Sequence, residues 1–216
     1  MRGRRLLGTL RRDLERRLRI FRSLGSTAIG GEFREADRLL AYAIIELLNT
    51  WSEFVRAYAL SCVARPQTES GLIVTLGNPA IRTQLDVIAA TIRKRRRGIY
   101  ANKPAGPWLR QEEPIWNDDG TLIACCSEIG ASHYGTVVTA FSLSTTVFED
   151  VKCWRNFYAH RNTQTCDEVR ARAAIHSIAR SEHPTRMVLR PAFGRPQPLI
   201  FDWFDDLARI ARTLCA

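Results

Sequence analysis

The stretch "TVFEDVKCWRNFYAH" (residues 146–160) predicts a helix and carries the most distinctive polar residues in the chain. Glu149 and Asp150 lie in its expected first turn, where the positive end of the helix dipole favours carboxylates. Near its expected end, Arg155, Asn156 and His160 place a guanidinium, an amide and an imidazole within about one and a half turns. This stretch therefore indicates both a helical fold and a candidate functional site.

Further helices are predicted on both sides of this stretch, because apolar residues recur there at three- and four-residue steps. The expected helices cover residues 4–24, 32–64, 78–98, 129–146, 166–180 and 202–216. The helix at 78–98 has the clearest boundaries, with Asn78 as N-cap, Pro79 in the first position and Gly98 past its end.

The connecting segments complete the expected fold. Residues 25–31 and the Pro-, Gly- and Asn-rich residues 99–120 are expected to be loops, and residues 186–201 to hold a short strand or two. The prediction is an all-α antiparallel helical bundle with one long Pro/Gly-rich loop and little or no β structure. It consists of a basic amphipathic helix at 1–24, packing on the core, and a helical domain at 30–216.

The N-terminal helix has an apolar stripe among arginines, formed by Leu6, Leu7, Leu10, Leu14, Leu18 and Phe21. Such a helix can dock on a protein core or lie on a membrane surface, and docking is the favoured interpretation. The sequence has no apolar run of eighteen residues and no secretory h-region at its start. We therefore expect a cytoplasmic protein without a membrane partner.

The six cysteines lack the spacing of a metal site, since no pair follows the CxxC pattern. We expect most of them to be small apolar core residues in a reducing compartment. The sequence thus predicts neither a metal nor another cofactor.

The chain is strongly basic, with 32 Lys and Arg residues against 22 Asp and Glu residues and a net charge of +10. Such a field attracts polyanions, of which nucleic acid is the commonest in cells. The densest basic segment is "RKRRR", which consists of Arg93, Lys94, Arg95, Arg96 and Arg97. It is a candidate RNA contact, and the alternative is a solvated helix end.

Arg155, Asn156 and His160 resemble the R-x4-H motif of the HEPN superfamily, whose preferred form begins with Arg-Asn. HEPN domains are small helical bundles, and many are metal-independent endoribonucleases of toxin–antitoxin, anti-phage and CRISPR systems. The stretch "NTWSEFVRAYALS" (49–61) is also similar to a helix of some bacterial HEPN proteins. The resemblance covers residues 30–180 and leaves the N-terminal helix and the segment after residue 184 unexplained.

The chemistry of the three residues agrees with RNA cleavage. RNA carries its own nucleophile, the 2′-hydroxyl, so the protein must supply a base, an acid and positive charge for the phosphorane. His160 can act as base or acid, Arg155 can hold phosphate oxygens, and Asn156 can orient the imidazole. Because Arg155 and His160 are separated by about 140° around a helix, one motif forms only half of a site.

The resemblance implies a homodimer in which two such helices meet. Trp154, Phe157 and Tyr158 can supply apolar contact area for it, and core packing is the alternative for all three, favoured for Trp154. The expected function is a HEPN-type endoribonuclease, a toxin or anti-phage effector that cleaves tRNA or mRNA to a 2′,3′-cyclic phosphate. An antitoxin or another defence protein is the expected partner. The expected site residues are Arg155, Asn156 and His160 for catalysis, Arg161 and residues 93–97 for RNA binding, and a Glu53–Arg56 pair as support.

Structural interpretations stand beside each of these assignments. The chain can instead be a catalytically silent HEPN-like module that binds nucleic acid, a nucleotide or a partner protein. His160 can simply cap the end of its helix, where a cation is favourable, and Arg155 can pair with Glu149, Asp150 or a neighbouring helix. His133 and His176 are isolated in the sequence and are expected to be structural or surface residues.

Overall fold

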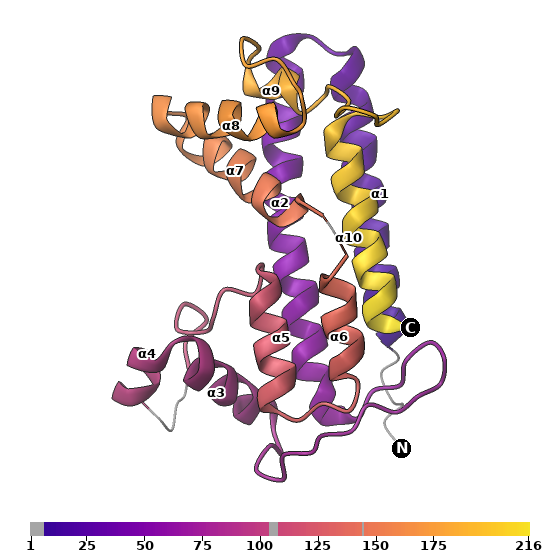
Figure 1. The fold of residues 1–216 in the computed structure, drawn as a ribbon, viewed down its shortest axis with the longest axis vertical. Helices are drawn as coiled ribbons and strands as arrows, with labels where there is room; N and C mark the ends of the chain where they lie inside the picture. The colour runs from indigo at the N-terminus through magenta and orange to yellow at the C-terminus, as the bar shows by residue number, and fades with distance from the viewer. Residues whose placement is uncertain (1–6, 104–107, 144) are drawn as a thin grey trace. The chain divides into compact units, whose positions relative to one another are not determined.

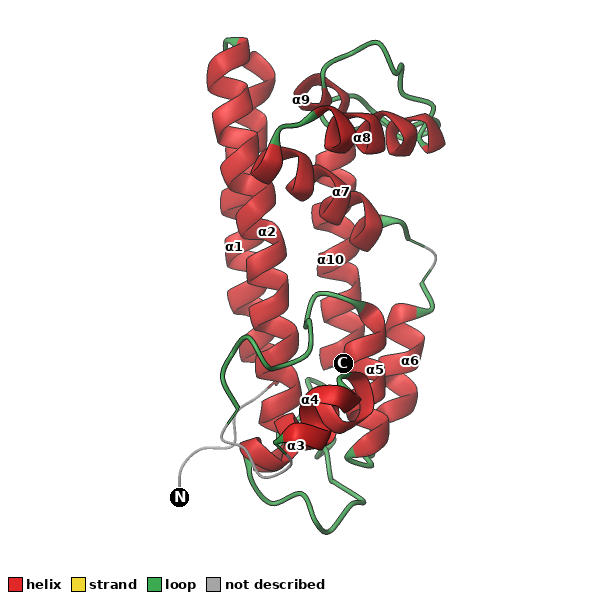
Figure 2. Cartoon of the chain, turned by 90° about the vertical axis from the view of Figure 1, so that its left-hand side faces the viewer, coloured by secondary structure: helices red, strands yellow, loops and turns green. Residues whose placement is uncertain are grey.

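The computed structural model describes residues 7–103, 108–143 and 145–216, and these residues form an all-α protein (Figure 2). The predicted fold class is therefore confirmed. Within the described residues, β structure is limited to three isolated bridges, at Gln67–Ile73, Leu76–Ala131 and Pro191–Pro198. The segment 186–201 thus holds a single bridge where a strand or two was expected. Leu6 of the predicted N-terminal stripe lies outside the described residues.

The chain divides into two compact units. Unit 1 comprises Met1–Leu14, Trp51–Ser144 and Ile210–Ala216, and unit 2 comprises Glu15–Thr50 and Thr145–Arg209. Three long helices contribute residues to both units: α1 (Leu7–Gly30), α2 (Phe33–Ser61) and α10 (Leu199–Cys215), all labelled in Figure 1. The one domain boundary predicted from the sequence lies between residues 24 and 30.

Helix α1 continues through residues 25–30, so the prediction of a loop at 25–31 was wrong. The buried stripe that contains Leu14, Leu18 and Phe21 extends past Gly25 to Ala28, which is 2% exposed. A Cβ atom at Gly25 would lie 2.8 Å from Cε1 of Phe201 on α10. The glycine therefore permits close helix packing within unit 2, and it does not break the helix.

Unit 1 contains α3 (Gln84–Arg95), α4 (Arg97–Asn102), α5 (Asp119–Glu128) and α6 (Tyr134–Phe141). The predicted helix at 78–98 begins later than expected and is broken at Arg96. Thr83 is the true N-cap: its hydroxyl accepts from the Asp86 amide at 3.2 Å, and the Asp86 carboxylate accepts from the Thr83 amide at 2.7 Å. This reciprocal capping box outcompetes Asn78, whose Oδ1 accepts locally from the Ala80 amide.

Two further boundaries in unit 1 differ from the sequence prediction. Helix α5 was missed, because Asp118 and Asp119 were interpreted as part of a loop; Asp118 is its N-cap and accepts from the Thr121 amide at 2.5 Å. The predicted helix at 129–146 is shorter, and the expected loop at 99–120 overlaps α4 and the start of α5.

Cys62, Cys125, Cys126 and Cys215 are buried, as predicted for small core residues.

Unit 2 contains α7 (Val147–His160), α8 (Thr163–Ile175) and the short α9 (Pro184–Met187). The prediction of a helix at 146–160 is confirmed. Helices α7 and α8 form an antiparallel hairpin, because Arg172 and His176 of the second half contact Asp150 near the start of the first (Figure 1). Arg161 makes the turn in a left-handed conformation with φ 47°, and Asn162 caps α8.

No helix within the described residues combines the length and apolar character that crossing a bilayer requires.

Candidate functional site

One side of α7 is buried and the opposite side carries the three motif residues. The buried side is formed by Val147, Asp150, Val151, Trp154, Phe157 and Tyr158. On a 3.6-residue repeat, Lys152, Arg155, Asn156, Ala159 and His160 fall within one arc of about 140° on the other side. Arg155 and Asn156 are half-buried, and His160 is exposed. Arg155 and His160 occupy the two edges of this arc, with Asn156 between them.

The motif side chains make no hydrogen bond or ion pair with any other residue that the structure describes. The structural alternative for Arg155 was a pair with Glu149 or Asp150, and both of these carboxylates bind Arg172 instead. The alternative for His160 was a place at the helix end, where a cation is favourable, and His160 is the basic residue in the last turn of α7. The pairing of Arg155 with Glu149 or Asp150 is therefore contradicted, whereas the helix-end interpretation of His160 stands beside the catalytic one.

The apolar residues next to the motif belong to the core of unit 2. Trp154, Phe157 and Tyr158 are 0%, 5% and 5% exposed. The indole nitrogen of Trp154 donates to the Pro184 carbonyl at 3.1 Å, and its ring lies 5.3 Å from that of Trp203. The prediction that these three residues supply contact area for a dimer was wrong, and the alternative of core packing is confirmed, because their side chains are buried within the chain.

Arg161 fixes the end of α7 to α2. Its Nη1 donates to Asp37 at 2.7 Å, and its guanidinium lies 5.5 Å from the centre of the Tyr158 ring. The other Asp37 oxygen accepts from the Thr185 hydroxyl, which itself accepts from Tyr158 at 3.2 Å. Burial raises the pKa of the Tyr158 hydroxyl. The network holds the residue that follows His160, and a contact of Arg161 with RNA stays a prediction.

Sequence reasoning missed Asp37 and Thr185 in this network. Asp37 is 124 positions from Arg161 and 148 from Thr185. No local pattern links residues at such separations, so only the fold could reveal them.

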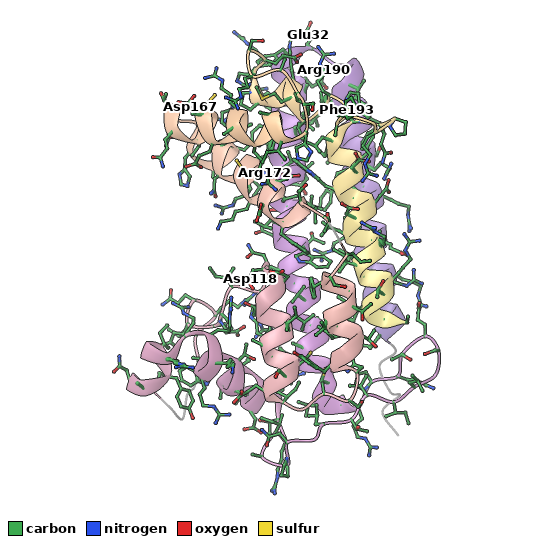
Figure 3. All side chains as sticks on the ribbon, viewed as in Figure 1. Glu32, Asp118, Asp167, Arg172, Arg190 and Phe193 are labelled. Carbon is green, nitrogen blue, oxygen red and sulfur yellow. The ribbon has the colours of Figure 1, made fainter. Side chains whose placement is uncertain are left out.

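Asp150 is the centre of a second polar cluster, at the start of α7. The carboxylate is fully buried and accepts from Thr146 at 2.6 Å, from His176 at 2.9 Å and from Trp203 at 3.2 Å. Arg172, labelled in Figure 3, also donates to it. Burial by itself raises the pKa of Asp150, but the hydrogen bonds from His176, Thr146 and Arg172 bring it below its ordinary value. His176, which looked isolated in the sequence, therefore has a structural partner.

The basic segment 93–97 is partly neutralised within unit 1. Arg93 pairs with Glu128 at 2.5 Å and Arg95 with Asp118 at 3.2 Å. Nη1 of Arg96 donates to the carbonyls of residues 111 and 113, each at 2.8 Å. Lys94 and Arg97 are exposed and have no ion pair with a described residue. An RNA contact by this segment stays a prediction, and only these two side chains are available for it without breaking an observed contact.

Arg56 has a different partner from the one that the helix spacing predicted. Its guanidinium binds Glu113 through two hydrogen bonds of 2.7 Å, and Glu113 also accepts from Arg110 and Trp116. The Glu113 carboxylate is 3% exposed, and its hydrogen bonds raise the pKa of the Arg56 guanidinium. Arg56 thus anchors the segment before α5 to α2 within unit 1. The supporting role predicted for Glu53 and Arg56 stays a prediction.

His133 lies beside a cavity of about 300 Å³ in unit 1, lined among others by Leu72, Val74, Thr136 and Leu214. Both ring nitrogens are buried and have no hydrogen-bond partner within the described chain. Burial lowers the pKa of His133 to about 4, so the imidazole is neutral at pH 7.

Among the residues described, no three His, Cys, Asp or Glu side chains gather closely enough to hold a metal ion. Comparison of the chain with protein-family models, curated proteins and solved structures finds no match. The chemistry of the described side chains therefore carries the functional argument.

Proposed function

We propose that this protein is a HEPN-type endoribonuclease that cleaves RNA without a metal ion. The observation that carries the proposal is the solvent-facing side of α7, where Arg155, Asn156 and His160 have no structural partner among the described residues. A helical protein with a net charge of +10 supplies a suitable setting for a polyanionic substrate.

Each motif residue has a distinct role in this reaction. His160 takes the proton of the 2′-hydroxyl, or, from a second copy, returns a proton to the departing 5′-oxygen. Arg155 binds the phosphate oxygens and stabilises the charge of the phosphorane. Asn156 lies one turn before His160 and can hold the imidazole or donate to the phosphate. The 2′-oxygen attacks phosphorus, the bond to the 5′-oxygen breaks, and a 2′,3′-cyclic phosphate remains.

One copy of the chain supplies too few groups for both proton transfers. Arg155 and His160 are separated by about 7.5 Å along the helix axis and by about 140° around it. We propose that two copies appose this side of α7 in a two-fold dimer. Ala159 lies exposed between the two edges, and its short side chain leaves the backbone accessible to a second helix. The buried aromatic residues take no part in this contact.

A toxin or anti-phage effector is the biological role that fits such an enzyme, because cleavage of tRNA or mRNA stops growth. A protein partner would then restrain it. A catalytically silent binding module is the second candidate. Exposed aromatic and basic residues of unit 2 favour it, because binding of a ligand does not require His160.

The decisive experiment incubates the purified protein with tRNA and with total RNA in EDTA. We expect cleavage products that end in a 2′,3′-cyclic phosphate, and loss of cleavage in His160→Ala. Lys152→Ala is the matched control, since it removes an exposed side chain from the same side of α7. Equal cleavage by the wild type and His160→Ala, or 3′-hydroxyl products, would overturn the mechanism.

The dimer is tested separately by light scattering and by mixing. An excess of the inactive His160→Ala chain should lower the activity of the wild-type chain after mixing, because the mixed dimer contains a single His160 imidazole and the two proton transfers need two. A monomer that cleaves RNA at full rate contradicts the shared site.

A further inference from the structure

Phe33, the first residue of α2, presents a partly uncovered aromatic ring between cationic and imidazole groups. The residue is 41% exposed. The Arg186 guanidinium lies 5.7 Å from the ring centre, and the His183 ring meets it edge-on at 5.0 Å. An exposed ring flanked by an arginine is the arrangement on which proteins stack unpaired bases.

Three of the four charged residues that act on His183 are arginines, while Glu32 and Glu35 flank Phe33 along the chain. Asp37, Arg161, Arg170 and Arg186 surround His183, and the single carboxylate among them is already paired with Arg161. Arg34 and Arg38 are exposed in the first two turns of α2 and have no ion pair with a described residue. These arginines can therefore bind phosphate groups without breaking an ion pair within the described chain.

His183 adds a hydrogen-bond donor to the same surface. Its Nδ1 accepts from the Thr185 amide at 3.2 Å, so the neutral ring carries its proton on Nε2. Burial lowers the pKa of His183, as do the neighbouring arginines, while Asp37 opposes them. The ring is thus neutral at pH 7 and can donate to a base edge or to a phosphate.

This surface is continuous with the end of α7. The ring of His183 lies 5.6 Å from that of Phe157, three positions before His160. Arg161, which follows His160, is among the charges that surround His183. A strand bound at Phe33 would therefore reach the motif within the same unit.

We propose that the Phe33 surface, formed by Phe33, Arg34, His183 and Arg186, binds single-stranded RNA. One base stacks on Phe33, and the arginines neutralise the adjacent phosphates. Stacking on a side chain requires an unpaired base, so the surface selects single strands and loops over duplexes. As a substrate-binding surface it rests on the proposed ribonuclease function, whereas the binding itself does not depend on cleavage.

Binding is measured by fluorescence anisotropy in a His160→Ala background, which prevents cleavage. The probes are a labelled single-stranded RNA of about twelve nucleotides and the same sequence as a duplex. Phe33→Leu keeps an apolar side chain but removes the aromatic face, and it should weaken single-strand binding about tenfold. Duplex binding should stay unchanged in this variant.

Arg186→Gln should weaken binding and reduce the salt slope by about 0.7. Arg180→Gln is its matched control, because Arg180 is an exposed arginine of unit 2 with no aromatic ring or ion pair beside it among the described residues. Wild-type affinity in Phe33→Leu, or equal effects of Arg180→Gln and Arg186→Gln, would overturn the proposal. One further outcome would overturn it: polyglutamate binds and this binding requires Arg186, whereas RNA binding does not require Arg186. The surface would then fit an acidic protein.

Cleavage assays separate this proposal from the ribonuclease proposal. With His160 intact, Phe33→Leu should raise the KM for the twelve-nucleotide RNA and leave kcat unchanged, because it removes a binding contact and no catalytic group. A wild-type protein that binds single strands through Phe33 but cleaves nothing would refute the ribonuclease and support the surface. Cleavage with equal KM values in both proteins would refute the surface alone.

Discussion

Replacement of Asp150 by asparagine should destabilise unit 2 more than any other single exchange of an acidic residue there. Asparagine keeps the shape of the side chain but removes its charge. In the wild type, Thr146, His176 and Trp203 donate hydrogen bonds to the carboxylate, and asparagine would present an amide group to these donors. The Arg172 guanidinium, 16% exposed, would lose its buried counterion.

The expected loss follows from these contacts. Removing one partner of a buried ion pair costs about 3–5 kcal/mol, because the other charge stays desolvated. Arg172 retains a 2.7 Å contact with Glu149, whose side chain is 76% exposed and strongly hydrated. This remaining contact places Asp150→Asn near the lower limit, at about 3 kcal/mol.

Urea denaturation at pH 7, followed by circular dichroism and tryptophan fluorescence, measures this loss. Asp167→Asn is the matched control on α8: its side chain is 61% exposed in an i,i+3 pair with Arg170, and the residue is labelled in Figure 3. The control should change the free energy of unfolding by less than about 1 kcal/mol.

The pH dependence gives an independent check. Because the pKa of Asp150 is lowered in the folded protein, the unfolded chain binds the proton first as the pH falls. The stabilisation is fully present above the ordinary aspartate pKa of about 3.9 and is lost as the pH falls through the folded pKa. The difference between wild type and Asp150→Asn should therefore shrink only in acid. A loss below about 1 kcal/mol at pH 7, or one equal to that of Asp167→Asn, would refute this reasoning.

Three further predictions follow from unit 1. His133→Phe should flatten the pH dependence of Tm between about pH 7 and pH 5, because the wild-type imidazole has a folded pKa of about 4 and is protonated first in the unfolded chain. Equal slopes in the two proteins contradict the burial of an unpartnered imidazole. Thr83→Ala should lower the free energy of unfolding, measured by urea denaturation, by about 1 kcal/mol, because the capping box is lost. An unchanged free energy would contradict Thr83 as the N-cap and favour Asn78. A double exchange of Lys94 and Arg97 to glutamine should lower the RNA salt slope by about 0.7 for each contact without a change in Tm. An unchanged slope identifies residues 93–97 as a solvated helix end.

The helices whose signals are local could be predicted from the sequence. The stripe at 146–160 and the acidic first turn identified α7 to within one residue, because the 3.6-residue repeat and the dipole act within the segment. The long α2 was found in the same way. The prediction of Asn78 as N-cap was wrong, although the reciprocal Thr83–Asp86 pair that caps α3 is itself a local signal.

The chemistry of Arg155, Asn156 and His160 could likewise be read from residue types and spacing, whereas only tertiary packing decided which side of α7 they occupy. Packing also buried Trp154, Phe157 and Tyr158 and thereby removed them from any dimer contact.

The partners of the charged residues were determined by tertiary structure alone. Asp150 and His176 are 26 positions apart, Arg56 and Glu113 are 57 apart, and Arg161 and Asp37 are 124 apart. Helix periodicity constrains neighbours only within one or two turns, so it could suggest Glu53 for Arg56 but could not find Glu113. Gly25 shows the same limit, because its place within α1 depends on the Phe201 ring that packs against it. A local pattern determines where a helix forms, and the fold determines what each of its side chains meets.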